Sequence, residues 1–275
     1  MIDTHAHVNF AAYKDDTAEV IKRALDNNVS IINVGSQFST SERTVKIAEE
    51  YDGVYSAIGL HPFHLFEQMV KEQVDENELI EIKSRAEKFD YKEYLDLAKT
   101  SKKVVAIGEC GLDFHYDGAD SPEARKIQSD VFNQQIDLAN ELSLPVIIHC
   151  RDGYGELIDI LKHNPIKKGG VAHCFGGNMQ DAKDLLEMDY YLGFTGVITF
   201  KNKVEKLQEV VKFAPVDKIL SETDCPYLTP VPNRGKRNEP LYVKYVVEKI
   251  AELRGFSFSE AEKITEENAR KLFRI

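Results

Sequence analysis

The chain has 275 residues, 43% hydrophobic and 29% charged, and 35 Lys and Arg against 46 Asp and Glu give it a net charge of −11. This composition excludes disordered, collagen-like and low-complexity chains, and the acidic balance argues against broad binding to duplex nucleic acid, which requires a basic face. No apolar run approaches the roughly 18 residues of a membrane-spanning helix, and the N-terminus lacks the features of an export signal, so we expect a cytoplasmic protein with no membrane partner.

Short apolar runs alternate with longer amphipathic stretches along the chain. The runs predict eight strands, at Met1–Thr4, Ser30–Val34, Val54–Leu60, Val104–Gly108, Pro145–Ile148, Gly169–Ala172, Tyr190–Phe194 and Lys218–Ser221. The stretches predict helices at Thr17–Asn27, Ser41–Glu50, Ser121–Leu142, Tyr154–His163, Met179–Glu187, Lys203–Phe213, Leu241–Arg254 and Ser259–Phe273. Nearly continuous apolar runs are typical of parallel strands buried on both faces. The pattern therefore predicts one α/β domain over residues 1–275, a single (β/α)8 TIM-type barrel with C-terminal helices, with an open doubly wound sheet as the alternative.

Two local features of this pattern lead to more specific predictions. The longest connection runs from His61 to Val104 and is rich in Glu and Lys, and we predict a helical excursion over Asn77–Thr100 with a solvated charged face. The last helix begins with Ser259 and Glu262, whose spacing predicts a capping box.

Ligand-type side chains gather at the ends of the predicted strands. His5 and His7 are two residues apart, so on a strand they face the same way. The carboxyl ends of parallel barrel strands meet at one end of the fold, where catalytic residues lie. Six N and O ligands exceed the three or so of a single catalytic zinc, and they suit two divalent ions that share Glu109 as a bridge. The predicted metal ligands are His5, His7, Glu109, His149, His173 and Asp224.

Several cationic residues near the predicted mouth are candidate substrate contacts. Arg151 follows His149 by two residues and offers a bidentate clamp for phosphate, although it could instead form an ion pair with Asp152 or Glu156. The loop after the last strand carries three more cations that could bind phosphate or only solvate the loop, namely Arg234, Lys236 and Arg237.

The remaining polar residues near the strand ends have simpler interpretations. Each cysteine directly follows a predicted ligand, and alternation along a strand would turn its thiol outward, toward the helices. We therefore expect small buried residues with free thiols rather than a zinc site or disulfides. Asp113 could orient a histidine or cap a turn, and we place His163 on the surface. The four cysteines are Cys110, Cys150, Cys174 and Cys225.

Eight motifs spread over the chain are characteristic of one family. They read IDTHAH at 2–7, GLHP at 59–62, GECGLD at 108–113, IHCRD at 148–152, HCFGG at 173–177, ETDCPYL at 222–228, RNEP at 237–240 and NARKLF at 268–273. In these the sequence resembles the TatD-type metal-dependent deoxyribonucleases of the metallo-hydrolase barrel superfamily. The resemblance implies a TIM-type barrel, metal ligation by the six residues above, an active-site role for His61 and hydrolysis of DNA, often from the 3′ end of single strands. Two residues depart from the family pattern, Asn9, where an acid is usual, and His64, which stands one residue later than is common.

The leading hypothesis is a phosphodiesterase with two divalent ions, which could be Mg, Mn, Zn or Ni. Asp224, Glu109 and His61 are the predicted catalytic residues, and Arg151, His61 and Arg237 the predicted substrate contacts. The expected partner is DNA, single-stranded or at 3′ ends, with no obligate protein partner. The alternatives are a hydrolase of a cyclic amide, lactone or aminoacyl ester, and a non-catalytic metal-binding scaffold. Phosphoester chemistry is favoured because Pro145–Arg151 contains no lysine that could bridge two metals.

Overall fold

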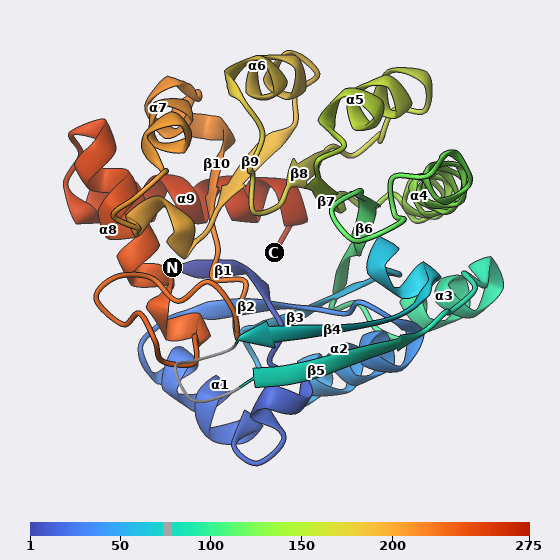
Figure 1. The fold of residues 1–275 in the computed structure, drawn as a ribbon. Coiled ribbons are helices and arrows are strands. Elements are labelled where there is room, and N and C mark those ends of the chain that lie inside the picture. The colour runs from blue at the N-terminus through green and yellow to red at the C-terminus, as the bar shows by residue number, and fades with distance from the viewer. Residues whose placement is uncertain (74–78) are drawn as a thin grey trace.

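The computed structural model describes residues 1–73 and 79–275. In it, eight parallel strands form a barrel (Figure 1). Their order is β1 (Ile2–Ala6), β2 (Ser30–Val34), β3 (Val54–Ile58), β6 (Val104–Asp113), β7 (Val146–Arg151), β8 (Gly170–Ala172), β9 (Tyr191–Phe194) and β10 (Ile219–Ser221). Backbone hydrogen bonds from His7 N to Cys225 O and from Asp224 N to His5 O join β1 to the segment after β10. The predicted barrel is confirmed, and the open sheet is wrong.

Helices surround the barrel on its outside (Figure 1). They are α1 (Thr17–Asp26), α2 (Phe38–Glu50), α3 (Tyr91–Ala98), α4 (Pro122–Leu142), α5 (Tyr154–His163), α6 (Met179–Glu187), α7 (Glu205–Phe213), α8 (Val243–Arg254) and α9 (Phe258–Phe273). Outward strand residues such as Ile58 pack in one core cluster with Phe132 of α4. Burial against helices on one side and the barrel interior on the other explains the continuous apolar runs. Among the described helices, none has the length and apolar character needed to cross a bilayer.

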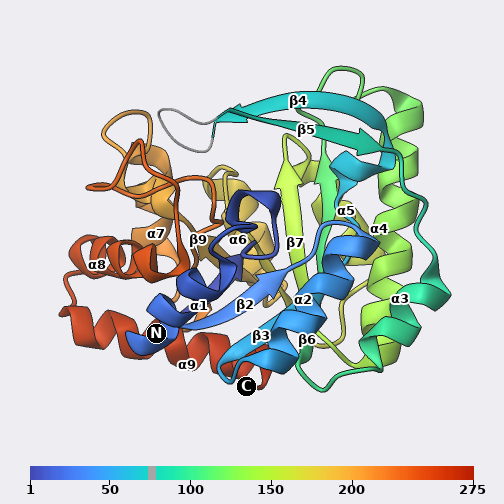
Figure 2. The same ribbon diagram turned by 90° about the horizontal axis from the view of Figure 1, so that it is seen from below.

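Helix α9 closes the amino-terminal end of the barrel. Its Leu272 and Phe273 are buried in one cluster with Ile32, Ile147 and other residues that point into the barrel. Figure 2 shows α9 lying across this end, opposite the end toward which β7 runs. The barrel interior below the site is therefore a packed core rather than a channel.

The amino-terminal cap of α9 differs from the prediction. The helix begins at Phe258, and its capping box is formed by Ser257 and Glu260 instead of Ser259 and Glu262. Both pairs have the same spacing, so the sequence pattern alone does not distinguish them. The backbone entering the helix decides the outcome, because Ser257 is extended and its hydroxyl accepts from Glu260 N.

The connection after His61 contains a β-hairpin as well as a helix. Strands β4 (Glu67–Gln73) and β5 (Leu79–Arg85) pair antiparallel, with Glu67 opposite Arg85. The helix predicted over Asn77–Thr100 is therefore wrong for residues 79–85 and correct for α3, while residues 77 and 78 lie outside the described residues. Cross-strand pairing, which the charge pattern does not reveal, determines this structure.

The hairpin lies over the carboxyl end of the barrel (Figure 2). Glu87, two residues after β5, holds its base in place: Glu87 N donates to His64 O at 2.7 Å, and Glu87 Oε1 accepts from Phe38 N at 2.9 Å. Tyr94 OH also donates to Glu87 Oε1, at 3.1 Å. The hairpin is thus attached to both α2 and α3 beside the mouth of the barrel.

Candidate metal centre

The carboxyl ends of the eight barrel strands surround a cavity of about 820 Å³, within the range of roughly 300–1,000 Å³ typical of ligand pockets. Segments at or after all eight strands contribute to its lining. His5 is fully buried and lies 3.4 Å from Glu109, measured from Nε2 to Oε2. The other five predicted metal ligands line the cavity, namely His7, Glu109, His149, His173 and Asp224.

Glu109 lies between two sets of imidazoles. Its Oε2 atom is 3.4 Å from His5 Nε2 and 3.6 Å from His7 Nε2. Its Oε1 atom is 2.8 Å from His149 Nδ1 and 3.4 Å from His173 Nε2. One carboxylate therefore presents a separate oxygen to each set of histidines.

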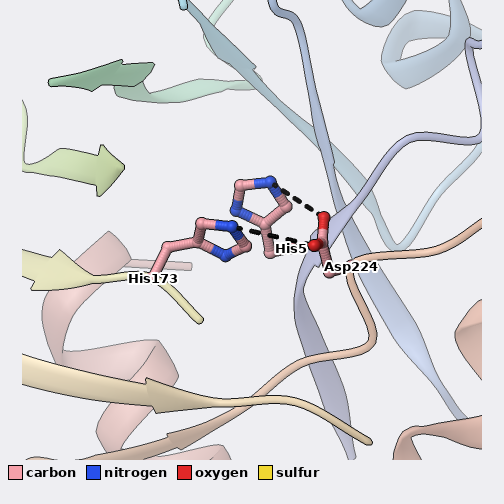
Figure 3. Close-up of side chains that lie close together, drawn as sticks. All are labelled: His5, His173 and Asp224. Carbon is pink, nitrogen blue, oxygen red and sulfur yellow. Dashed lines mark ion pairs between the residues drawn. The ribbon is translucent and has the colours of Figure 1, made fainter. Parts of the chain in front are cut away.

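Asp224 completes the cluster from the segment after β10. Its Oδ1 atom is 3.4 Å from His7 Nε2 and 3.8 Å from His5 Nε2, and its Oδ2 atom is 4.0 Å from His173 Nε2. Figure 3 shows His5 and His173 directed toward this carboxylate, and their rings stack with centroids 3.5 Å apart. The fold thus brings all six predicted ligands together.

The unexpected length of β6 positions Glu109. The strand continues past its predicted end at Gly108 as far as Asp113, and it pairs Gly111 with His149 of β7. Gly111 has a φ of 147°, and a Cβ atom there would collide with the carbonyl oxygen of His149. A glycine is required at this point because the two strands approach so closely.

Three histidines donate a hydrogen bond from one ring nitrogen to an oxygen atom of the protein and turn the other nitrogen toward the cluster. His7 Nδ1 donates to Val34 O at 2.9 Å, and His173 Nδ1 donates to Glu222 Oε1 at 2.9 Å. His149 Nε2 donates to Asp113 Oδ2 at 3.0 Å, which confirms that Asp113 orients a histidine. Since a carbonyl or carboxylate oxygen only accepts, the opposite nitrogen of each neutral ring carries a lone pair. Such partners are typical of metal-binding histidines.

His61 has the opposite arrangement. Its Nδ1 atom accepts from Phe63 N at 3.0 Å, so the neutral ring carries its proton on Nε2, 3.5 Å from Glu109 Oε1. Burial and the neighbouring His149 lower the pKa of His61, which favours this neutral form. His61 therefore presents an N–H donor to the cluster, whereas His7, His149 and His173 in their neutral forms present lone pairs.

Buried charges strongly shift the pKa values of the cluster. Burial lowers the pKa of His5 to about 4. Burial also opposes protonation of His149, but hydrogen bonds to Asp113 and Glu109 outweigh it and raise the pKa of that ring to about 10. Although burial alone would raise the pKa of Glu109, His61 and His5 hold it well below its usual value. The carboxylates are thus ionised, and their negative potential attracts cations.

The donor set fits a divalent cation. Three overlapping groups each place their ligand atoms within 4.8 Å of one another. Imidazole nitrogen suits Zn and Ni, and carboxylate oxygen suits Mg and Mn. The groups are His5 with His7 and Glu109, His5 with His173 and Asp224, and His61 with Glu109 and His149.

Comparison with known proteins identifies the family. The family model described as TatD related DNase matches residues 2–274. The chain belongs to the TatD family. A Bacillus subtilis protein named Uncharacterized metal-dependent hydrolase YabD is 46% identical over 277 residues, covering 100% of this chain and 99% of that protein. An Erwinia tasmaniensis protein named 3′-5′ ssDNA/RNA exonuclease TatD is 34% identical, with 100% of both chains covered.

The solved structure of YJJV, a TatD homolog from Escherichia coli K12, has the same architecture. It matches with a TM-score of 0.86 at 28% identity, covering 100% of this chain and 98% of that one. Together with the relatives' names, this likeness makes the chain a metal-dependent hydrolase that acts on ester bonds, as the sequence predicted.

Sequence reasoning missed the role of Glu222 in this TatD-family centre. The residue is fully buried, and its Oε1 atom accepts from both His173 Nδ1 and Cys174 N. A Cβ atom on Gly193 would lie 2.5 Å from Glu222 Oε2, so a glycine there leaves space for the carboxylate. The available signal was position, because Glu222 precedes Asp224 by two residues at the end of a strand.

Arg151 lies at the mouth of the cavity, where its position two residues after His149 predicted it. It is exposed and lines the cavity, with its Cζ atom 5.9 Å from the centroid of the Tyr116 ring. The two carboxylates considered as its partners have other contacts, since Asp152 lies 3.1 Å from His115 Nδ1 and Glu156 accepts from Arg125 at 3.1 Å. Arg151 therefore remains a candidate substrate contact.

Arg237 is placed differently from the expectation. Its guanidinium makes two hydrogen bonds to the Asp16 carboxylate and stacks over the Tyr13 ring, with Cζ 4.5 Å from the centroid. It is not among the residues that line the cavity. In the same loop, Arg234 NH1 donates to Thr229 O at 3.0 Å. The Arg237 contacts hold the loop after β10 against the segment after β1, so we assign Arg237 a structural role.

The four cysteines have free thiols, as predicted, but their orientations differ. Cys110 and Cys225 are completely buried, and burial raises the pKa of Cys225 to about 12. In contrast, Cys150 and Cys174 line the cavity. The prediction of outward thiols assumed extended backbone, and Cys174 instead has a φ of 42°. His163 is exposed on α5, as expected.

Proposed function

We propose that this protein hydrolyses phosphodiester bonds of DNA, in single strands or at 3′ ends, with two divalent cations in the centre described above. The observation that carries this proposal is that the two carboxylate oxygens of Glu109 face different histidines. Its Oε2 faces His5 and His7, and its Oε1 faces His149 and His173. The name of the Erwinia tasmaniensis relative, an exonuclease for single-stranded DNA and RNA, also supports it.

Each cation has its own set of protein ligands in this proposal. His5, His7 and Asp224 would hold one ion, and His149 and His173 the other, with Glu109 shared. When bound, such ions act as Lewis acids on phosphoryl oxygens and lower the pKa of an attacking water. His173 lies between the sets, because its Nε2 is near both Glu109 and Asp224.

Three side chains would perform the remaining chemistry. Asp224 lines the cavity, and His173 lowers the pKa of its carboxyl although burial opposes this, so the ionised group can orient a water and accept its proton. The His61 Nε2–H group and the Arg151 guanidinium would donate to phosphate oxygens as negative charge develops on them.

The cavity explains how an acidic protein would accept a polyanion. Its described lining includes four carboxylates but only two guanidinium groups, those of Arg43 and Arg151. Bound metal ions are the largest local charges in such a site and reverse its field. The hairpin over the mouth (Figure 2) favours a single strand or a free end over continuous duplex.

Digestion of labelled single-stranded DNA and RNA in parallel, with added Mg, Mn, Zn or Ni, tests the proposal. We expect cleavage of DNA by the wild-type protein, loss of cleavage in excess chelator and loss in Glu109→Ala. A matched control is Glu209→Ala, because Glu209 is an exposed glutamate on α7 paired with Lys212 at the surface. Undiminished cleavage by Glu109→Ala, or with chelator, would refute the proposal.

The same preparation should be assayed on lactones, cyclic amides and aminoacyl esters. Among the described residues that line the cavity there is no lysine to bridge two metals, so we expect phosphodiesters to be the preferred substrates. Turnover of one of these carbonyl substrates, with no cleavage of DNA or RNA, would refute the nuclease proposal and support the alternative of a carbonyl hydrolase. Metal uptake without turnover of any substrate would indicate a scaffold.

A further inference from the structure

We propose that Arg43 and Phe10 form a second nucleotide subsite, across the mouth from Arg151 and Tyr116, for the phosphate and base adjacent to the bond that is cleaved. This inference rests on the proposed nuclease function and extends it. All four residues line the cavity. Neither Arg43 nor Phe10 was indicated by the sequence motifs, because Arg43 lies on a helix and Phe10 is not a ligand-type residue.

The topology places the two arginines on opposite sides of the metal centre. Arg151 is the last residue of β7, the fifth strand around the barrel. Arg43 belongs to α2, after the second strand, and its NH1 donates to the carbonyl of Asn9, after the first strand, at 2.8 Å. In a barrel of eight strands, the first and fifth face each other. A substrate strand across the centre would therefore meet one arginine on each side.

The charge distribution indicates what these arginines bind. Arg43 and Arg151 are both exposed, and among the described residues that line the cavity they are the two arginines, with no lysine beside them. The metal ions would neutralise only the phosphate at the centre. Neighbouring phosphates of the same strand would lie over an acidic protein, and a guanidinium on either side supplies paired donors for a phosphate.

An aromatic ring accompanies each arginine. Phe10 follows Asn9, the residue that Arg43 contacts, and stacks on His7 with centroids 4.3 Å apart and planes at 13°. Tyr116 lies beside Arg151 and packs edge-on against Phe63, with centroids 5.1 Å apart. Stacking on aromatic side chains is a sequence-tolerant way to bind bases of single strands. Each side of the mouth thus offers a partner for a phosphate and one for a base.

The test compares substrates with and without neighbouring nucleotides. We would measure kcat/KM for bis(p-nitrophenyl) phosphate, which has one phosphate and no base, and for hexathymidylate. Loss of one charge-assisted contact in Arg43→Ala should lower kcat/KM on hexathymidylate about tenfold more than on the small ester. The control is Lys46→Ala, because Lys46 is exposed one turn later on α2 and is not among the residues that line the cavity.

Phe10→Leu separates base stacking from phosphate binding. Relative to kcat/KM on the small ester, this variant should have a lower kcat/KM on hexathymidylate. Its relative kcat/KM on an abasic hexamer should equal that of the wild type. Metal content, measured for every variant, checks that the change beside His7 has not emptied the centre. Equal losses on both hexamers would mean that Phe10 binds no base, and equal effects of Arg43→Ala on hexathymidylate and the small ester would overturn the subsite.

Failure of the proposed function gives a different result. If the wild-type protein hydrolyses neither phosphodiester, the nuclease function is refuted, and fluorescence anisotropy of labelled hexathymidylate then decides the subsite separately. Binding that weakens about tenfold in Arg43→Ala but not in Lys46→Ala would retain it as a nucleotide site. No binding, or binding that is unaffected by Arg43→Ala, would eliminate it.

Discussion

Replacing Glu222 with glutamine tests whether a buried carboxylate outside the ligand set tunes the centre. Glu222 Oε1 accepts from His173 Nδ1 at 2.9 Å and from Cys174 N, and Oε2 accepts from Thr4 Oγ1 at 3.4 Å. Glutamine has nearly the same shape and retains one acceptor oxygen. The change therefore removes the charge while leaving the packing beside Gly193 in place.

The structure sets the size of the effect. Hydrogen bonds to charged groups contribute roughly twice as much as neutral ones, a difference of about 1 kcal/mol per bond. The bond to Cys174 N is present with or without metal, so its weakening lowers the free energy of unfolding by about 1 kcal/mol. The bond to His173 maintains the ring's basicity toward a metal, and loss of such partners weakens metal affinity about 10- to 100-fold.

Isothermal titration with Zn²⁺ or Mn²⁺ would measure the affinity, and urea denaturation of the metal-free protein would measure the stability. We expect Glu222→Gln to bind metal at least tenfold more weakly than the wild type. Glu209→Gln, on the surface of α7, should change stability by less than about 0.5 kcal/mol. Wild-type metal affinity in Glu222→Gln would refute the assigned role of Glu222.

Three other predictions follow from the packing and charges of the fold. Phe273→Ala, in the helix that closes the barrel, should lower the free energy of unfolding by about 3–5 kcal/mol in urea denaturation. Phe213 is 48% exposed on α7, so Phe213→Ala should lower the free energy of unfolding far less. Equal effects of the two variants would contradict the packing of α9. A divalent ion at about 100 times its dissociation constant should stabilise the protein by roughly 2.7 kcal/mol, seen as a rise in Tm that chelator reverses and Glu109→Ala lacks. Glu222 and Glu109 raise the pKa of His173 to about 9 despite its burial, so protons compete with metal for this ring below that pH. Titration of the protein with metal at pH 6.5 and 8.5 should show tighter metal binding at the higher pH. The opposite trend would contradict this competition.

Much of the fold could be predicted from local patterns. Apart from the carboxyl end of β6, every end of the eight barrel strands lies within three residues of its predicted position, because strands buried on both faces carry continuous apolar runs. The ligand set was also visible, since His5, Glu109 and Asp224 follow or end such runs and parallel strands bring their carboxyl ends together. Strand order and ligand type could thus be predicted from local sequence patterns.

The contacts between distant segments could be recognised only in the folded chain. The β4–β5 hairpin depends on cross-strand pairing, the role of Arg237 on the position of Asp16, and the orientation of Cys174 on a left-handed turn of its backbone. The contacts of Glu222 with His173 and of Arg43 with Asn9 join segments that follow different strands, so they depend on how the assembled barrel places those segments. Periodicity reports which face of an element is buried, whereas a partner's identity depends on register and closure, which involve the whole chain at once.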